Sequence, residues 1–131
     1  DAVATAEQQP EVDHNMKAER SERGHFQSEG WRDAKNGGFF AYNMDTKGEE
    51  NLTLMVRYWG NESGNRSFDI LIDGQVLTTE NIVGKWKREA FVNAEYQIPA
   101  EWLKGKEVIN VRFQSKPGTV AGGVFYVRLI K

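Results

Sequence analysis

The chain has 131 residues and a formal net charge of −2 at pH 7, from 17 basic and 19 acidic residues. This length predicts one domain, and the scattered charges exclude the clustered Lys and Arg that nucleic-acid binding needs. The absence of cysteine excludes disulfides, a thiolate nucleophile and a thiolate metal site. No apolar run approaches the ~20 residues of a membrane-spanning helix, so no membrane partner is expected.

The first 13 residues, DAVATAEQQPEVD, are predicted to form a flexible linker or a frayed terminus. They are small, polar and acidic, and they show no apolar periodicity. The abrupt beginning is what a piece of a longer polypeptide would show. We therefore expect a single folded domain over residues 14–131.

The rest of the chain alternates apolar and polar residues in the manner of β-strands. An Asp-Gly pair at residues 73–74 predicts a tight hairpin turn, and Pro99 with Gly105 predicts one short helical turn between them. Strands are expected at 16–20, 38–45, 52–59, 67–73, 76–77, 90–97, 109–114 and 123–130. About eight short strands with frequent turns predict an all-β fold, a jelly-roll-like β-sandwich.

The densest group of candidate site residues is the segment GWRDAKNGGFFAY. The faces of Trp31 and Tyr42 could pack on the C–H faces of a sugar ring, while Arg32, Asp33 and Asn36 supply directional hydrogen bonds. In the alternative interpretation the aromatic side chains belong to the core and Arg32 pairs with a carboxylate. Residue types alone favour this structural alternative, because buried aromatic residues are common in sandwiches.

Two further tryptophans are candidates for the same site. Trp59 ends a strand beside the polar loop NESGN, where sandwich proteins often carry ligands. Trp86 lies between Lys85 and Lys87, so it is expected to be the most exposed tryptophan, as a ligand platform, a lid over the core edge or a contact with a neighbouring domain.

No catalytic residue is predicted. Asp69 and Asp73 share a strand face, but a single hairpin offers no substrate cleft between them. His14 and His25 lack the other residues of a nucleophilic triad and of a zinc site. A structural calcium held by Glu19 would be the only metal, and no loop has an ordered calcium spacing.

The order of several motifs resembles a known domain. The segments are WRDAKNGGFFAYNM, LMVRYWG, FDILIDGQVLTTENI and AEYQIPAEWLKGKEVINVRFQSKPGTVAGGVFYVRLI. Together they resemble the C-terminal β-sandwich domain of bacterial glycoside hydrolases of the β-L-arabinofuranosidase type (family 127 and relatives), which are common in gut Bacteroides. In that family the catalytic residues, including a cysteine, lie in a separate (α/α)6 barrel.

The resemblance implies a non-catalytic accessory domain of an exported enzyme, located in the periplasm, on the cell surface or outside the cell. Its partners would be the parent catalytic domain and an arabinose-containing plant glycan. A fainter likeness to carbohydrate-binding modules of families 6 and 35 rests on the opening strand, which contains Glu19. Their final strand carries an Asp that helps to hold calcium, and here Val127 and Arg128 occupy that region.

Two functions therefore remain open. The domain binds carbohydrate, or it packs against the catalytic barrel to stabilise it or to mediate dimerisation. Exposure of two tryptophans among Trp31, Trp59 and Trp86 on one concave face would favour sugar binding, and burial of all three would favour the structural role.

Overall fold

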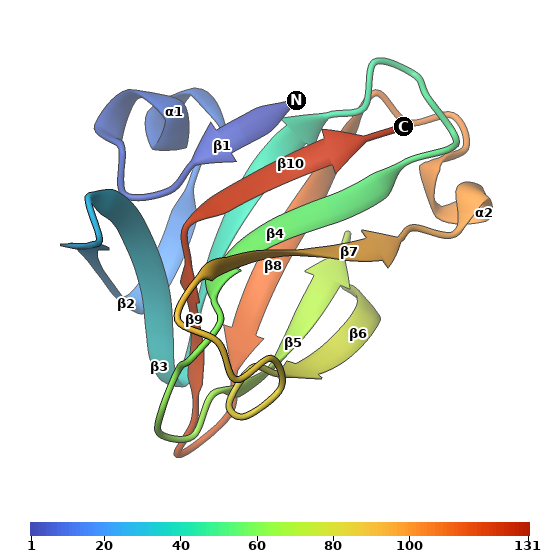
Figure 1. Ribbon diagram of the computed structural model, residues 1–131. Coiled ribbons are helices and arrows are strands. Elements are labelled where there is room, and N and C mark those ends of the chain that lie inside the picture. Colours follow the sequence, from blue (N-terminus) through green and yellow to red (C-terminus); the bar gives the residue numbers. More distant parts are fainter.

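Ten strands form two antiparallel sheets that pack face to face in the computed structural model, which describes residues 1–131 (Figure 1). One sheet has the strand order β1-β10-β4-β7, and the other has the order β2-β3-β8-β5-β6 with β9 added against β3. This confirms the predicted all-β, jelly-roll-like sandwich. The strands are β1 (Ala2–Ala4), β2 (Lys17–Phe26), β3 (Glu29–Asp45), β4 (Thr53–Trp59), β5 (Ser67–Ile72), β6 (Gln75–Asn81), β7 (Phe91–Gln97), β8 (Val108–Ser115), β9 (Val120–Val124) and β10 (Tyr126–Ile130).

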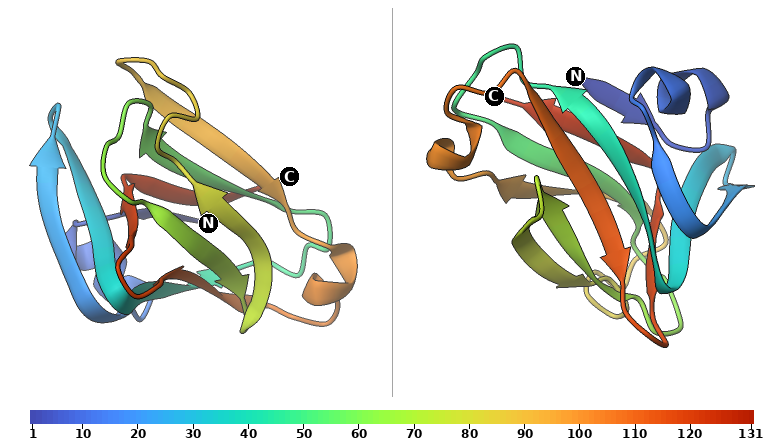
Figure 2. Two further views of the ribbon diagram at one scale, coloured as in Figure 1. Left: turned by 90° about the horizontal axis from the view of Figure 1, so that it is seen from below. Right: turned by 180° about the vertical axis from the view of Figure 1, so that it is seen from behind.

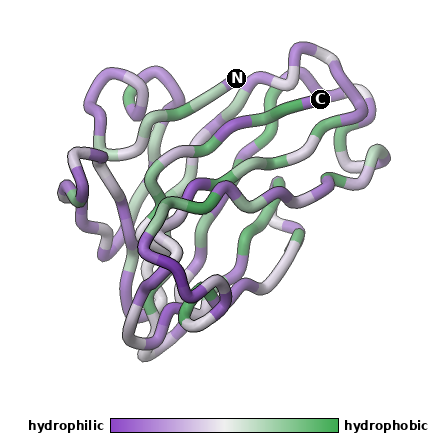
Figure 3. Tube along the Cα trace, in the orientation of Figure 1, coloured by the Kyte–Doolittle hydropathy of each residue, from purple (hydrophilic) through white to green (hydrophobic).

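The core lies between the two sheets and is built by alternation along the strands. In β4 the residues Leu54, Val56 and Tyr58 are fully buried, and in β8 Ile109, Val111 and Phe113 are fully buried, while their neighbours face outward. Figure 3 shows the same alternation of hydrophobic and hydrophilic residues along the strands. Alternation arises because successive side chains point to opposite faces of a sheet.

Residues 1–13 are part of the folded domain, which differs from the linker that their composition predicted. β1 pairs with β10, with Val3 fully buried, and helix α1 (Gln8–Asp13) follows. The helix is attached through Glu11, whose carboxylate is buried and receives two hydrogen bonds from Arg32. The linker was predicted because β1 has only three residues and the helix is held by a polar side chain. Neither feature produces the hydrophobic periodicity on which the prediction depended.

Strand β3 is much longer than predicted, because it continues into a hairpin with β2. The connecting residues Gln27 and Ser28 both have positive φ, at 52° and 65°, which is the geometry of a type I′ turn. Neither is Gly, Asn or Asp, so the usual sequence signal is missing. Figure 2 shows this hairpin projecting from the body of the sandwich.

The C-terminal run predicted as one strand is broken at Phe125. β9 pairs with β3 in the larger sheet, whereas β10 pairs with β4 in the smaller sheet. The chain therefore crosses from one layer to the other at Phe125, beside the end of β4.

The predicted helical turn is present as α2 (Ala100–Leu103). Neither α1 nor α2 is long and apolar enough to cross a membrane.

Candidate functional site

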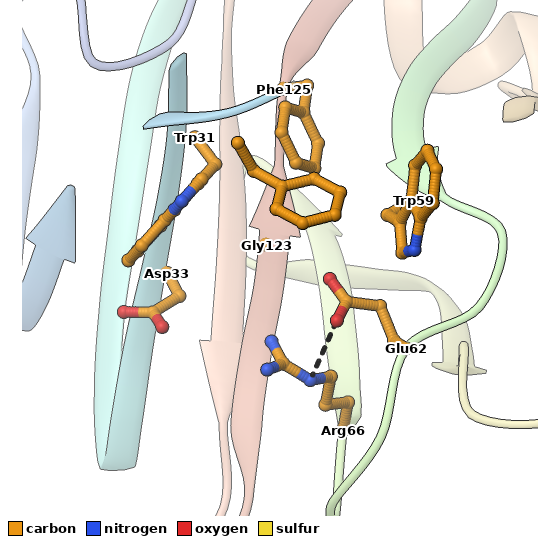
Figure 4. Close-up of a pocket in the computed structure, with 8 residues that line it drawn as sticks. Trp31, Asp33, Trp59, Glu62, Arg66, Gly123 and Phe125 are labelled. Atoms are coloured by element: carbon orange, nitrogen blue, oxygen red, sulfur yellow. Dashed lines mark ion pairs between the residues drawn. The ribbon is translucent and has the colours of Figure 1, made fainter. Parts of the chain in front are cut away.

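A pocket of about 160 Å³ lies where four parts of the chain meet (Figure 4). They are the tip of the β2–β3 hairpin with the start of β3, the end of β4, the β4–β5 loop, and the crossing from β9 to β10. The pocket is lined by Phe26, Trp31, Asp33, Trp59, Glu62, Arg66, Gly123 and Phe125. Figure 4 shows Trp31 and Trp59 on opposite sides, with the ion pair between Glu62 and Arg66 near the Trp59 side.

One wall of the pocket is a cluster of packed aromatic rings. The ring of Trp59 makes edge contacts with Phe26, at 4.9 Å between centroids, and with Phe91, at 5.1 Å. Phe91 in turn contacts Phe125 at 4.8 Å, and the Arg57 guanidinium lies 4.5 Å above the Phe91 ring. Trp59 keeps only 8% of its surface exposed, so these neighbours hold it in one orientation and leave part of its surface to the pocket.

Phe26 is the exposed part of this wall. It lies at the end of β2, next to the hairpin turn, and 40% of its surface is exposed although its ring contacts Trp59. An aromatic ring at a pocket mouth exposes apolar surface to water, and a ligand with an apolar face would cover that surface.

The opposite wall depends on a glycine in the neighbouring strand. Gly24 lies directly opposite Trp31 in the β2–β3 register. A Cβ atom at residue 24 would lie only 2.6 Å from Cζ2 of the Trp31 indole, closer than two carbon atoms can approach. The absence of a side chain at Gly24 therefore lets the Trp31 ring lie across β2 and form the pocket wall.

Asp33 contributes a buried carboxylate to the same pocket. It lies two residues after Trp31, on the same face of β3, and is 6% exposed. Burial raises its pKa, against the opposing effects of Lys35 and of the backbone N–H of Glu22. Its Oδ1 atom has no hydrogen-bond partner, and a buried carboxylate oxygen without a donor is costly.

Glu62 and Arg66 complete the polar side of the pocket. Burial raises the pKa of Glu62, and the Arg66 guanidinium, with Nε 3.6 Å from Oε1, only partly offsets this. Arg66 also donates from Nε to the carbonyl oxygen of Ser63 at 2.8 Å and from Nη1 to that of Gly122 at 2.9 Å. The guanidinium is thus fixed between the β4–β5 loop and β9.

Residues 1–130 match the sequence model of DUF6805, which is described as a family of unknown function. The chain belongs to this family. A comparison with curated proteins finds no match.

Solved structures share the fold of this DUF6805 domain at low sequence identity. A family 35 carbohydrate-binding module from Cellvibrio japonicus has a TM-score of 0.66 and 12% identity, over 99% of this chain and 91% of that chain. A family 6 module from Clostridium cellulolyticum, solved in complex with xylose, has a TM-score of 0.65 and 9% identity, over 100% and 97%. A family 35 module solved with a disaccharide containing glucuronic acid has a TM-score of 0.57 and 12% identity, over 99% and 92%. The fainter likeness noted in the sequence is confirmed at the level of the fold.

Of the tryptophans predicted for a site, the DUF6805 structure brings two together. Trp31 and Trp59 line the pocket, Trp31 half-buried and Trp59 largely buried. Trp86 lies elsewhere, with its ring stacked on Tyr58 at 5.7 Å and the Lys85 ammonium 5.2 Å above it. The exposure of the tryptophans therefore favours neither alternative. Sugar binding would have two of them exposed on one face, but Trp59 is buried; the structural role would have all three buried, but Trp31 and Trp86 are only partly buried.

The remaining predicted residues do not reach the pocket. Arg32 follows Trp31 in the strand and so points to the other face, where it binds Glu11 at 2.7 and 2.9 Å. Tyr42 is buried in the core and donates its hydroxyl to Glu11 at 2.6 Å. Asn36 has positive φ in a bend of β3, and its Oδ1 accepts a hydrogen bond from the backbone N–H of Gly118.

Five pocket residues were not singled out by the sequence: Phe26, Glu62, Arg66, Gly123 and Phe125. The polar loop that contains Glu62 was noted only as the neighbour of Trp59. Alternation does pair Asp33 with Trp31 on one strand face, and this signal was available from sequence alone.

The structure gathers no group of three or more His, Asp or Glu side chains that could hold a metal ion. Glu19, the predicted calcium ligand, is exposed on β2 opposite Phe39.

Proposed function

We propose that this domain binds carbohydrate, and that the pocket between Trp31 and Trp59 holds one sugar ring. The observation that carries the proposal is the combination of facing aromatic walls with carboxylate and guanidinium groups in a single small cavity. Sugar rings present apolar C–H faces and hydroxyl groups that both donate and accept hydrogen bonds, which this combination matches.

The size of the pocket supports one ring rather than several. Its volume of about 160 Å³ is roughly half of the ~300 Å³ at which pockets begin to enclose drug-sized ligands. The fold supports the same proposal, since modules of this architecture have been solved with xylose and with a disaccharide containing glucuronic acid.

The sequence resemblance supports a wider context for this function. The domain would be the accessory module of an exported bacterial glycoside hydrolase, in the periplasm, on the cell surface or outside the cell. It would keep an arabinose-containing plant glycan near the catalytic barrel and carry out no hydrolysis itself. Arabinan and arabinoxylan are accordingly the first polysaccharides to test.

A structural role against a catalytic barrel remains the second proposal. It is favoured by the coverage of Trp59, because most of this aromatic surface is already occupied by the domain's own rings. Against it, the large exposed apolar residues outside the pocket are Val12, Val76 and Val108, which lie on three different elements. Deleting the domain from the full enzyme decides between the two proposals. If the domain stabilises the barrel, the deletion lowers the barrel's melting temperature; if it binds carbohydrate, the deletion lowers only the affinity for polysaccharide.

Isothermal titration calorimetry of the 131-residue chain with neutral methyl glycosides and plant polysaccharides tests the binding proposal. Trp31→Ala should weaken binding by about tenfold or more, because it removes the aromatic surface that a ring face would cover. The matched control is Phe39→Ala, whose ring stacks on Arg112 in the outer face of the larger sheet. Equal losses in both variants, or no binding of any glycan at millimolar concentration, would contradict the proposal.

A further inference from the structure

One of the three charged side chains that line the pocket has no ion-pair partner. Glu62 pairs with Arg66, and at the periphery Glu22 pairs with Lys35 at 3.3 Å. The Arg57 guanidinium, which lies against the aromatic wall, pairs with Glu29 at 2.9 Å. Asp33 takes part in no such pair, so the pocket carries an excess of one negative charge.

Arg66 is the only cationic group that lines the pocket, and it is already engaged. Two of its three guanidinium nitrogens donate to the carbonyl oxygens of Ser63 and Gly122, and the Glu62 carboxylate lies beside it. Recognition of a carboxylate by arginine normally uses two parallel N–H donors on one edge. The Nε side of the guanidinium is not available for such a contact, because the Nε–H points to the Ser63 carbonyl, and the charge of Arg66 is already paired with that of Glu62.

The two carboxylates, in contrast, have unused acceptor capacity. Asp33 Oδ1 has no donor, and rotation about the soft terminal torsion of an aspartate exchanges the positions of its two oxygens. Glu62 receives only the long contact from Arg66. Each carboxylate oxygen can accept from a ligand hydroxyl, and such charge-assisted hydrogen bonds are stronger than neutral ones.

We infer that the pocket selects a neutral sugar whose hydroxyl groups donate to Asp33 and Glu62, and that it rejects the corresponding uronic acid. This inference rests on the proposed function and specifies its ligand. A uronate would bring a third carboxylate into a site whose one arginine is already paired with Glu62, and uncompensated like charges in a binding site weaken the affinity.

Calorimetry with paired ligands tests the selection. The probes are the methyl glycosides of xylose, arabinofuranose, glucose and galactose, and the methyl glycosides of glucuronate and galacturonate, at pH 7 in the presence of EDTA and again with added calcium. At least one neutral glycoside should bind, about tenfold or more tighter than any uronate.

Two variants connect the selection to the carboxylates. Asp33→Asn should weaken neutral-sugar binding by about tenfold, because a charge-assisted hydrogen bond becomes a neutral one, and it should narrow the gap to the uronates. Glu62→Gln should act in the same direction and serves if Asp33→Asn does not fold. Phe39→Ala, away from the pocket, should change neither affinity.

The outcomes separate the inference from the function on which it rests. A uronate that binds as tightly as the neutral sugars overturns the inference and leaves carbohydrate binding standing. A uronate that binds only with calcium also overturns it, by showing that the carboxylates hold a cation. If no probe binds in either condition, the proposed function fails and the inference fails with it.

Discussion

The buried pair of Glu11 and Arg32 joins the N-terminal helix to the sandwich, and its removal should be strongly destabilising. The Glu11 carboxylate is 3% exposed and accepts hydrogen bonds from Arg32 at 2.7 and 2.9 Å and from the Tyr42 hydroxyl at 2.6 Å. The Arg32 guanidinium also donates to the Ser21 hydroxyl at 2.9 Å. All the strong acceptors around Arg32 are thus supplied by two side chains.

The single substitution Glu11→Met leaves the buried guanidinium without its counter-charge. Loss of one partner of a buried ion pair costs about 3–5 kcal/mol, because the remaining charge is desolvated and unpaired. For a domain of 131 residues, with about 2.1 cal/mol/K of unfolding entropy per residue, this corresponds to a decrease in Tm of about 11–18 °C.

The double substitution Glu11→Met with Arg32→Met should be far less harmful than the sum of the two single substitutions. Replacing both charges with apolar side chains of similar length removes the unpaired charge. The remaining losses are the acceptor of the Tyr42 hydroxyl and the donor to the Ser21 hydroxyl. The expected coupling between the two positions is therefore several kcal/mol, measured by chemical unfolding of the four proteins in a double-mutant cycle.

The stabilisation by Glu11 should also depend on pH. Burial alone would raise its pKa, but the hydrogen bonds from Arg32 and Tyr42 and the Arg32 charge outweigh burial and lower it. A carboxyl with a lowered pKa in the folded state stabilises the protein above its ordinary value of 4.5, and this stabilisation is lost as the pH falls through the folded-state value. The difference in stability between wild type and Glu11→Gln should shrink in acid. If the effects of Glu11→Met and Arg32→Met in the double-mutant cycle add to within about 0.5 kcal/mol, the two side chains are not coupled and the reasoning is refuted.

Three further predictions concern the pocket and the residues near it. Asp33→Asn should raise Tm by about 3–4 °C at neutral pH, because removing a buried unpaired charge gains about 1 kcal/mol. Burial raises the pKa of Asp33, so this gain should vanish below the ordinary pKa of 3.8. A lower Tm of the variant at pH 7 would contradict the prediction. Gly24→Ala should displace the Trp31 indole, seen as a shifted tryptophan emission and weakened sugar binding, whereas unchanged emission and affinity would show that the ring does not rest on Gly24. Trp86→Ala should lower the free energy of unfolding by about 3 kcal/mol through loss of the ring's packing on Tyr58 and the core, while calorimetry should find sugar affinity unchanged.

The strands of the sandwich were readable in the sequence because their signal is local. Leu54, Val56 and Tyr58 alternate with outward-facing residues, and the pair Asp73-Gly74 adopts the positive φ values, 49° and 83°, that its hairpin turn requires. Alternation follows from the geometry of a single strand, so it needs no knowledge of neighbours. The sequence alone thereby determined the all-β class, the turn at residues 73–74 and the candidacy of Trp31 and Trp59.

The composition of the site was decided by tertiary structure, because it depends on contacts between distant segments. Phe26 reaches Trp59 only through a hairpin turn without a glycine, and Phe125 reaches the pocket only because the chain changes sheets there. Glu11 is buried through hydrogen bonds from Arg32 and Tyr42, and no periodic pattern in the sequence predicts this burial. Such pairings follow from loop closure and sheet packing across the whole domain, and no spacing within a single strand encodes them.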